Sequence, residues 1–184
     1  MISIHALLRK IYLALFRPDP LAILIKLGLV VGKNFHMQDD VVIDTSHCWH
    51  ITIGDDVTLA PHVHILAHDA STKMHLGYTR IGKVTIGNRV FVGASTIILP
   101  GVTIGNDVVI GAGSVVTRDI PDGVVAVGNP AKVVASLEEF LARRKAEIQA
   151  GPLFDETYQL RHQPSAEMKA AMNKKIGDGV GYII

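Results

Sequence analysis

The segment IGNRVFVGASTIILPGVTIGNDVVIGAGSVV, residues 86–116, carries an aliphatic residue at every sixth position. An amphipathic helix repeats its apolar residues every three to four positions, and a half-buried strand repeats them every two. A chain that forms a short strand, turns at a corner and then repeats gives the observed period of six. The segment therefore predicts a parallel β-solenoid, in which stacked coils send their aliphatic side chains into one shared interior.

The same spacing extends upstream of this segment, with two changes of phase. All twelve positions at six-residue steps are aliphatic or Met: Val31, Met37, Ile43, Ile53, Leu59, Ile65, Ile86, Val92, Ile98, Ile104, Ile110 and Val116. A glycine often follows, as at Gly32, Gly54, Gly87 and Gly105. Three such steps make one triangular coil of 18 residues, whose strands pair with those of the next coil about 4.8 Å away.

Composition fits this fold and excludes several classes of protein. The chain of 184 residues has the length of one domain. Hydrophobic residues make up 48% but aromatic residues only 5%, so Val, Ile and Leu must build the core. The formal charge of +1 gives no sign of a nucleic-acid partner. One cysteine, Cys48, excludes an internal disulfide framework and a cysteine-cluster zinc site, and fits a reducing compartment.

Helices are expected at both ends of the solenoid. Residues 1–30 are predicted to form a helical cap over its open end, with one apolar face made by Ile4, Leu7, Leu8, Ile11 and Leu15. Contact of the basic face of this helix with a membrane surface stays open as an alternative. At the other end, Ser136 and Glu139 form a capping box. Residues 136–184 are therefore predicted to be a helical extension, with a second helix over about 165–176.

Four motifs identify a family that this chain resembles. They are IGNRVFVGA (86–94), PGVTIGND (100–107), IGAGSVVTRDIP (110–121) and GNPAKV (128–133). They resemble the hexapeptide-repeat acyltransferases, in particular the galactoside and maltose O-acetyltransferases and the related cell-surface polysaccharide O-acetyltransferases. The resemblance covers roughly residues 31–135. It implies a left-handed parallel β-helix, an exception to the usual crossover hand, and a homotrimer.

The longer phase break contains a loop, residues 71–85, and a loop longer than a corner needs is usually functional. The first candidate catalytic residue is therefore expected beside this loop. Seven of the nine histidines lie between His36 and His75. His68 belongs to ILAHDAS (65–71), and the resemblance assigns the catalytic base to a histidine at this place. An imidazole takes a proton near neutral pH, so it can activate a hydroxyl that attacks a thioester directly. Cys48 is interpreted as a small buried hydrophobe and not as a nucleophile.

Acceptor-binding residues are predicted around His68 and in the shorter phase break. Asp69 could orient a base or bind substrate hydroxyls, and a corner aspartate that accepts backbone N–H bonds is the equally open alternative. In SHCWH (46–50), Trp49 could stack on a sugar face and His47 could bind a hydroxyl, although packing explains Trp49 equally well. Gln38 falls near a substrate-contacting amide of the resembled enzymes.

The resemblance also implies a site for acetyl-CoA along the coils, between two subunits. The matching positions are Ala94, Ala112, Thr117, Arg118 and Lys132. The two cations can pair with phosphates of the donor. The Ala94 N–H is the candidate for stabilising the thioester oxyanion.

These patterns predict an acetyl-CoA-dependent O-acetyltransferase that needs no metal. It would act on a sugar hydroxyl in surface polysaccharide or glycolipid synthesis in the cytoplasm. N-acetylation of an amino sugar or nucleotide sugar is the nearest alternative. Two further alternatives share the fold: a zinc-dependent carbonic anhydrase that uses His62, His64, His68 and His75, and a solenoid scaffold without catalysis.

Overall fold

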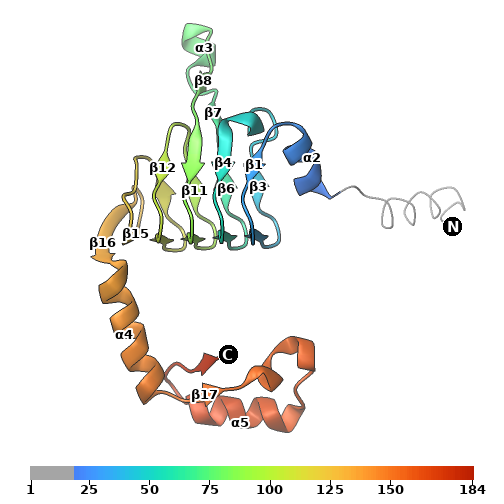
Figure 1. Cartoon of the computed structure of the whole chain (residues 1–184), viewed down its shortest axis with the longest axis vertical. Coiled ribbons are helices and arrows are strands. Elements are labelled where there is room, and N and C mark those ends of the chain that lie inside the picture. The colour runs from blue at the N-terminus through green and yellow to red at the C-terminus, as the bar shows by residue number, and fades with distance from the viewer. Residues whose placement is uncertain (1–18) are drawn as a thin grey trace, which may run out of the picture. The chain divides into compact units, whose positions relative to one another are not determined.

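The computed structural model describes residues 19–184, and the chain divides between Ala135 and Ser136 into two compact units. The first unit is a stack of coils (Figure 1). Within the described residues, no helix is long and apolar enough to cross a membrane. The apolar helix face predicted from Ile4 to Leu15, and with it the alternative of a membrane contact, lies outside the described residues.

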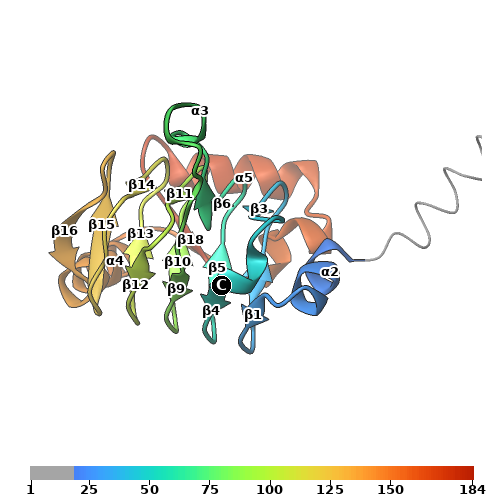
Figure 2. The same cartoon turned by 90° about the horizontal axis from the view of Figure 1, so that it is seen from above.

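Three sheets form the sides of the coil stack, and Figure 2 shows the coils side by side in a row. The first sheet contains β1 (Val30–Val31), β4 (Ile51–Ile53), β9 (Val84–Ile86) and β12 (Thr103–Ile104). The second contains β2 (His36–Met37), β5 (Thr58–Leu59), β10 (Phe91–Val92), β13 (Val109–Ile110), β15 (Val124–Val127) and β16 (Lys132–Ser136). The third contains β3 (Val42–Ile43), β6 (His64–Ile65), β11 (Ile97–Ile98) and β14 (Val115–Val116). From β1 to β14 the chain visits the three sheets in turn, so each of these four coils contributes one strand to each sheet, and β15 and β16 then extend the second sheet.

The pairing of the strands places the twelve repeat residues in three columns. Parallel pairs align Val31, Ile53, Ile86 and Ile104 in the first sheet, Met37, Leu59, Val92 and Ile110 in the second, and Ile43, Ile65, Ile98 and Val116 in the third. Ten of the twelve are at most 3% exposed, and Val31 and Met37 in the first coil are half-buried. The predicted interior ladder is therefore confirmed.

Side chains at the corner between the first and second sheets tie each coil to the next. The oxygens of Asp55, Asn88, Asn106 and Asp122 each accept a backbone N–H from the preceding coil, at 2.7–2.9 Å. One position earlier, the coils approach so closely that a side chain does not fit. A Cβ on Gly87 would lie 2.7 Å from the backbone of Gly105. The glycine and the Asn or Asp of the repeat are thus two parts of one contact between coils.

The first coil is covered by α2 (Pro20–Lys26), which begins at Asp19, whose side chain accepts the N–H of Leu21 (Figure 1). Leu24 and Leu29 are buried in the same hydrophobic core as Cys48, which is completely buried. Cys48 therefore has the small buried role that the sequence predicted.

Two excursions interrupt the coils, and both connect the third sheet to the first. After β3 the chain forms the short 3-10 helix η1 (Cys48–His50). After β6 it forms an antiparallel hairpin of β7 (His68–Asp69) and β8 (Arg80–Ile81), with α3 (Lys73–Leu76) at its tip, which projects from the stack (Figures 1 and 2). The excursion thus starts at His68, earlier than the predicted loop of residues 71–85. Because both excursions leave the same sheet in successive coils, they lie at one corner of the solenoid.

The second unit contains two α-helices and a small sheet. Its elements are α4 (Leu137–Ala150), β17 (Leu153–Phe154), η2 (Glu156–Tyr158), η3 (Leu160–His162), α5 (Ala166–Ile176) and β18 (Tyr182–Ile183). The predicted capping box of Ser136 and Glu139 is present at the start of α4. β17 and β18 pair in parallel. The Tyr182 hydroxyl donates to Glu147, which ties β18 to α4.

Candidate active site

Asp44 is a buried carboxylate at the corner where the two excursions begin. It follows β3 directly and is 4% exposed. Its Oδ1 accepts the backbone N–H groups of Ser46 and His47 at 2.9 and 3.1 Å, and its Oδ2 accepts that of Ala67 at 2.9 Å. Burial raises the pKa of Asp44, but hydrogen bonds from His68 and from these backbone groups outweigh it and lower the pKa below 3.8. Asp44 is therefore an anion at neutral pH.

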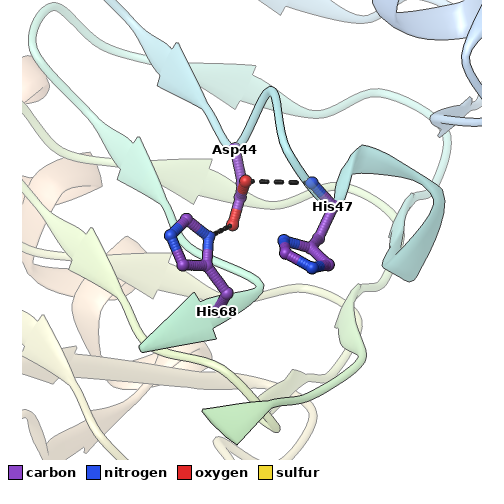
Figure 3. A group of neighbouring side chains, drawn as sticks. All are labelled: Asp44, His47 and His68. Atoms are coloured by element: carbon purple, nitrogen blue, oxygen red, sulfur yellow. Dashed lines mark hydrogen bonds and ion pairs between the residues drawn. The ribbon is translucent and has the colours of Figure 1, made fainter. Parts of the chain in front are cut away.

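His68 lies against this carboxylate, with Nδ1 2.5 Å from Asp44 Oδ2 (Figure 3). Because Asp44 is ionised, Nδ1 carries the proton and donates it to the carboxylate. Nε2 is then the unprotonated nitrogen, free to accept a proton. The His68 side chain is 34% exposed, so the imidazole is partly open to solvent. A histidine held by a buried carboxylate is the arrangement of a general base.

Two of the predicted acceptor residues lie beside this pair, on η1. The His47 ring centroid is 5.0 Å from that of His68 and 5.3 Å from that of Trp49. The Trp49 side chain is exposed. The structure thus brings His47, Trp49 and His68 together, although η1 and β7 belong to different coils.

The other two predicted acceptor residues have different surroundings. Asp69 Oδ1 accepts the N–H of Ser71 at 2.8 Å, the turn contact that was one of the two alternatives for this residue. This hydrogen bond lowers the pKa of Asp69, with smaller contributions from Arg80 and His68. Gln38 is exposed at the corner between the second and third sheets, whereas His68 lies at the corner between the third and the first. Gln38 is therefore not part of this cluster.

A cavity of about 340 Å³ gathers three of the predicted donor residues, Thr117, Arg118 and Lys132, together with Pro130 and Ala131. Neither of its two cations forms an ion pair within residues 19–184. Thr117 occupies the column of Asp44, because each follows the last strand residue of the third sheet in its coil. The cavity is therefore on the same corner of the solenoid as His68.

The two predicted donor alanines lie at a different corner. Ala94 and Ala112 follow β10 and β13, so they stand between the second and third sheets. The N–H of Ala94 has no acceptor among residues 19–184, and its carbonyl accepts the N–H of Gly113 at 2.8 Å. The Ala94 amide is free to bind a ligand, but one chain does not bring it to His68.

Comparison with known proteins decides the family. A family model described as bacterial transferase hexapeptide (six repeats) matches residues 83–118. Protein CapG of Staphylococcus aureus is 43% identical over 120 residues, which are 62% of this chain and 70% of CapG. The chain belongs to the hexapeptide-repeat acyltransferases. The family predicted from the motifs is thus confirmed.

Solved structures of this family share the fold. A maltose O-acetyltransferase from Clostridium difficile 630 is 44% identical with a TM-score of 0.53, over 59% of each chain. A hexapeptide-repeat acetyltransferase from Vibrio cholerae, solved with acetyl-CoA, is 29% identical with a TM-score of 0.54, over 60% of this chain and 61% of that one. The chain thus spans about three fifths of each of these acetyltransferases. Like them it is an acyltransferase.

Asp44 is a residue of the candidate site that the sequence motifs did not predict. The corresponding positions in the next three coils are Leu66, Leu99 and Thr117. A carboxylate in a column of such residues needs hydrogen-bond partners. The polar residue directly after the ladder residue Ile43 departs from the repeat, and this departure could have indicated that Asp44 has a special role.

The four histidines of the zinc alternative are not gathered within one chain. Among residues 19–184, the one group of three residues arranged as metal ligands is Asp44, His47 and His68. The Asp44 oxygens already accept four hydrogen bonds, which use the acceptor capacity of a carboxylate. The group of Asp44, His47 and His68 therefore suits an oriented base better than a metal centre.

Proposed function

We propose that this acyltransferase transfers the acetyl group of acetyl-CoA to a hydroxyl of a sugar, in the synthesis of a surface polysaccharide or glycolipid. The observation that carries the proposal is the His68 imidazole, held by Asp44 through Nδ1 and partly exposed to solvent. The names of similar proteins support the reaction, since one is a maltose O-acetyltransferase and another was solved with acetyl-CoA.

In the reaction, the acceptor oxygen attacks the thioester carbonyl while His68 Nε2 takes the hydroxyl proton. The carbon–sulfur bond then breaks, and the leaving sulfur of coenzyme A receives the proton from His68. The products are the sugar ester and free coenzyme A, and no acyl-enzyme is needed. The Asp44 carboxylate stabilises the imidazolium that exists between the two proton transfers.

The acceptor would bind at the surface formed by η1 and the hairpin. Trp49 offers an exposed ring next to His47, which in turn lies beside His68, and this ring is a suitable face for the apolar side of a sugar. His47, whose ring is 5.0 Å from that of His68, and Asp69, which follows His68 on β7, are the polar residues that we propose for binding the acceptor. Gln38 stays a prediction, at a different corner of the solenoid.

The donor would bind along the coils with its phosphates against Arg118 and Lys132, which share one cavity with Thr117. The Ala94 amide would bind the oxyanion. Because Ala94 and His68 stand at different corners of one chain, we propose that a second copy supplies the Ala94 edge. We propose a homotrimer of left-handed solenoids, with each site between two copies. The protein would use acetyl-CoA of the cytoplasm.

The test is the variant His68→Ala with acetyl-CoA and a panel of sugars as acceptors. Release of coenzyme A should fall by about 10²–10⁴-fold in kcat, the usual contribution of a general base. Acetyl-CoA should still raise the melting temperature, because the donor cavity does not include His68. His64→Ala is the matched control, since His64 lies on neighbouring β6, contacts the His62 carbonyl oxygen through Nδ1 and does not belong to the Asp44, His47 and His68 group. Wild-type turnover in His68→Ala would disprove the proposal.

A further inference from the structure

The end of α2 packs directly against η1, the short helix beside the candidate base. Cys48 is the first residue of η1 and is completely buried. Its Sγ lies 3.7 Å from the carbonyl oxygens of Leu24 and of Leu27, which are 24 and 21 residues earlier in the chain. A thiol is a weak hydrogen-bond donor, and these carbonyl groups are its acceptors. The Cys48 side chain therefore links η1 to the last turn of α2.

Gly28 forms a second contact between the same two elements. Its φ is +107°, and a Cβ at this position would lie 2.9 Å from the Cβ of Trp49 on η1. Side chains rarely tolerate this backbone conformation, and none fits here unless η1 moves. Gly28 thus allows the chain after α2 to approach η1 closely. The contacts at Cys48 and Trp49 hold two successive residues of η1 against α2.

The residues that lead into η1 hold the Asp44 carboxylate. The backbone N–H groups of Ser46 and His47 both donate to Asp44 Oδ1, at 2.9 and 3.1 Å. The other oxygen, Oδ2, accepts the proton of His68 Nδ1. Figure 3 shows the bond from His47 on one oxygen of the carboxylate and the contact with His68 on the other. A shift of η1 would therefore turn the carboxylate and change the orientation of His68.

We infer that Cys48 and Gly28 are positioning residues. They fix η1 against α2, and η1 holds the Asp44 carboxylate in the orientation that His68 needs. This inference rests on the function proposed above, in which His68 is the base. Cys48 and Gly28 act only through the other residues and bind neither substrate. α2 thus contributes to catalysis in addition to covering the first coil.

The experiment measures kcat for Cys48→Ala, Cys48→Ser and Gly28→Ala at saturating acetyl-CoA, below the melting temperature of each variant. Cys48→Ala removes the link to α2, and Gly28→Ala pushes η1 away from α2. Each should lower kcat by about 10-fold, because a misplacement of about 1 Å can cost about 10²-fold. KM for acetyl-CoA should not change, since the donor cavity contains no residue of η1. Cys48→Ser keeps a hydrogen-bond donor and should recover most of the activity.

Two control variants separate positioning from a general loss of stability. Val108→Ala also truncates a buried side chain, next to β13. Gly123→Ala also places a side chain at a positive φ, 69°, but nothing lies within 4 Å of the added Cβ. Both controls should lower the melting temperature and keep the wild-type kcat. A wild-type kcat in folded Cys48→Ala or in folded Gly28→Ala would overturn the inference.

The tautomer of His68 gives a readout that does not depend on turnover. Nitrogen chemical shifts of the neutral imidazole distinguish a proton on Nδ1 from one on Nε2. The wild type and Val108→Ala should show the Nδ1–H form, whereas Cys48→Ala and Gly28→Ala should show a share of the Nε2–H form, because the carboxylate no longer faces Nδ1. An unchanged tautomer in both variants would overturn the inference even if kcat fell. If the wild type acetylated no sugar, the proposed function would fail, and a changed tautomer would still support positioning of the imidazole by α2.

Discussion

The substitution Asp44→Asn tests the candidate site, because the amide keeps the shape of the carboxylate and changes its charge and hydrogen bonding. The carboxylate accepts four hydrogen bonds, two at each oxygen. An amide has one oxygen and one NH₂ group. Whichever way the amide turns, its NH₂ group faces donors: the N–H groups of Ser46 and His47 on one side, or the N–H of Ala67 and His68 on the other.

Both orientations weaken the base. If the NH₂ group faces His68, Nδ1 must accept, and the proton then moves to Nε2, which can no longer take one from the acceptor. If it faces the backbone instead, His68 keeps its tautomer but loses the charge that stabilises its protonated form. We expect kcat to fall by about 10²–10⁴-fold. We also expect the free energy of unfolding to fall by about 1–3 kcal/mol, because a buried donor meets another donor.

The assay for Asp44→Asn is the release of coenzyme A at saturating acetyl-CoA, with the melting temperature measured in parallel. KM for acetyl-CoA should not change, because the cavity lined by Arg118 and Lys132 does not include Asp44. Asp56→Asn is the matched control at an exposed corner, where Asn also tolerates the positive φ of 57°. A kcat for Asp44→Asn equal to that of the control would refute the role of Asp44.

The free energy of unfolding of the wild type and that of Asp44→Asn should also depend differently on pH. The folded pKa of Asp44 is below its ordinary value of 3.8. The ionised carboxylate therefore stabilises the fold fully above that value, and this contribution is lost as the pH falls through the folded pKa. The difference in unfolding free energy between wild type and Asp44→Asn should be constant near neutral pH and shrink below about pH 4. A difference that stays constant down to pH 2 would contradict the hydrogen-bond assignment.

Two further predictions concern the donor and the coils. Arg118→Ala should raise KM for acetyl-CoA by about 10-fold with little change in kcat, because a cation in the donor cavity is removed; Arg143→Ala, a change in the second unit, should leave both values unchanged. Gly87→Ala should lower the free energy of unfolding by about 1–3 kcal/mol in denaturant titrations, because its Cβ would lie 2.7 Å from the Gly105 backbone. Gly179→Ala is its control, since the added Cβ would make only an ordinary contact at 3.4 Å, and equal effects of the two changes would show that coil spacing is not the cause.

The solenoid could be predicted because its rules are local. Outside the two excursions, each ladder residue is six positions from the next, and residues such as Ile98 stack on ladder residues of the neighbouring coils. The glycine and Asn or Asp that follow are required by the approach of neighbouring coils, as Gly87 and Asn88 illustrate. A short repeat thus contains all the information that its own stacking needs.

The candidate site could be predicted only in part, because it is assembled from contacts between coils. His68 was recognisable from a local motif. Its partner Asp44 lies 24 residues earlier, and the residues around Asp44 do not indicate that its side chain will contact His68 of the next coil. The donor side has the same limit. Thr117, Arg118 and Lys132 gather in one cavity, but the sequence did not indicate that Ala94 would stand at another corner.

The place of the excursions explains why the site exists at all. Regular coils fill the interior with aliphatic side chains and expose only narrow corners, which offer little room for an acceptor. The chain takes ten residues instead of six from Ile43 to Ile53, and twenty-one from Ile65 to Ile86. Since Ile43 stacks on Ile65, both insertions leave the third sheet at the same corner. If one of the two insertions followed a strand of the second sheet instead, Asp44 and His68 would lie at different corners of the solenoid. The stacking register therefore brings Asp44 and His68, which lie in or beside two separate insertions, into one candidate catalytic pair.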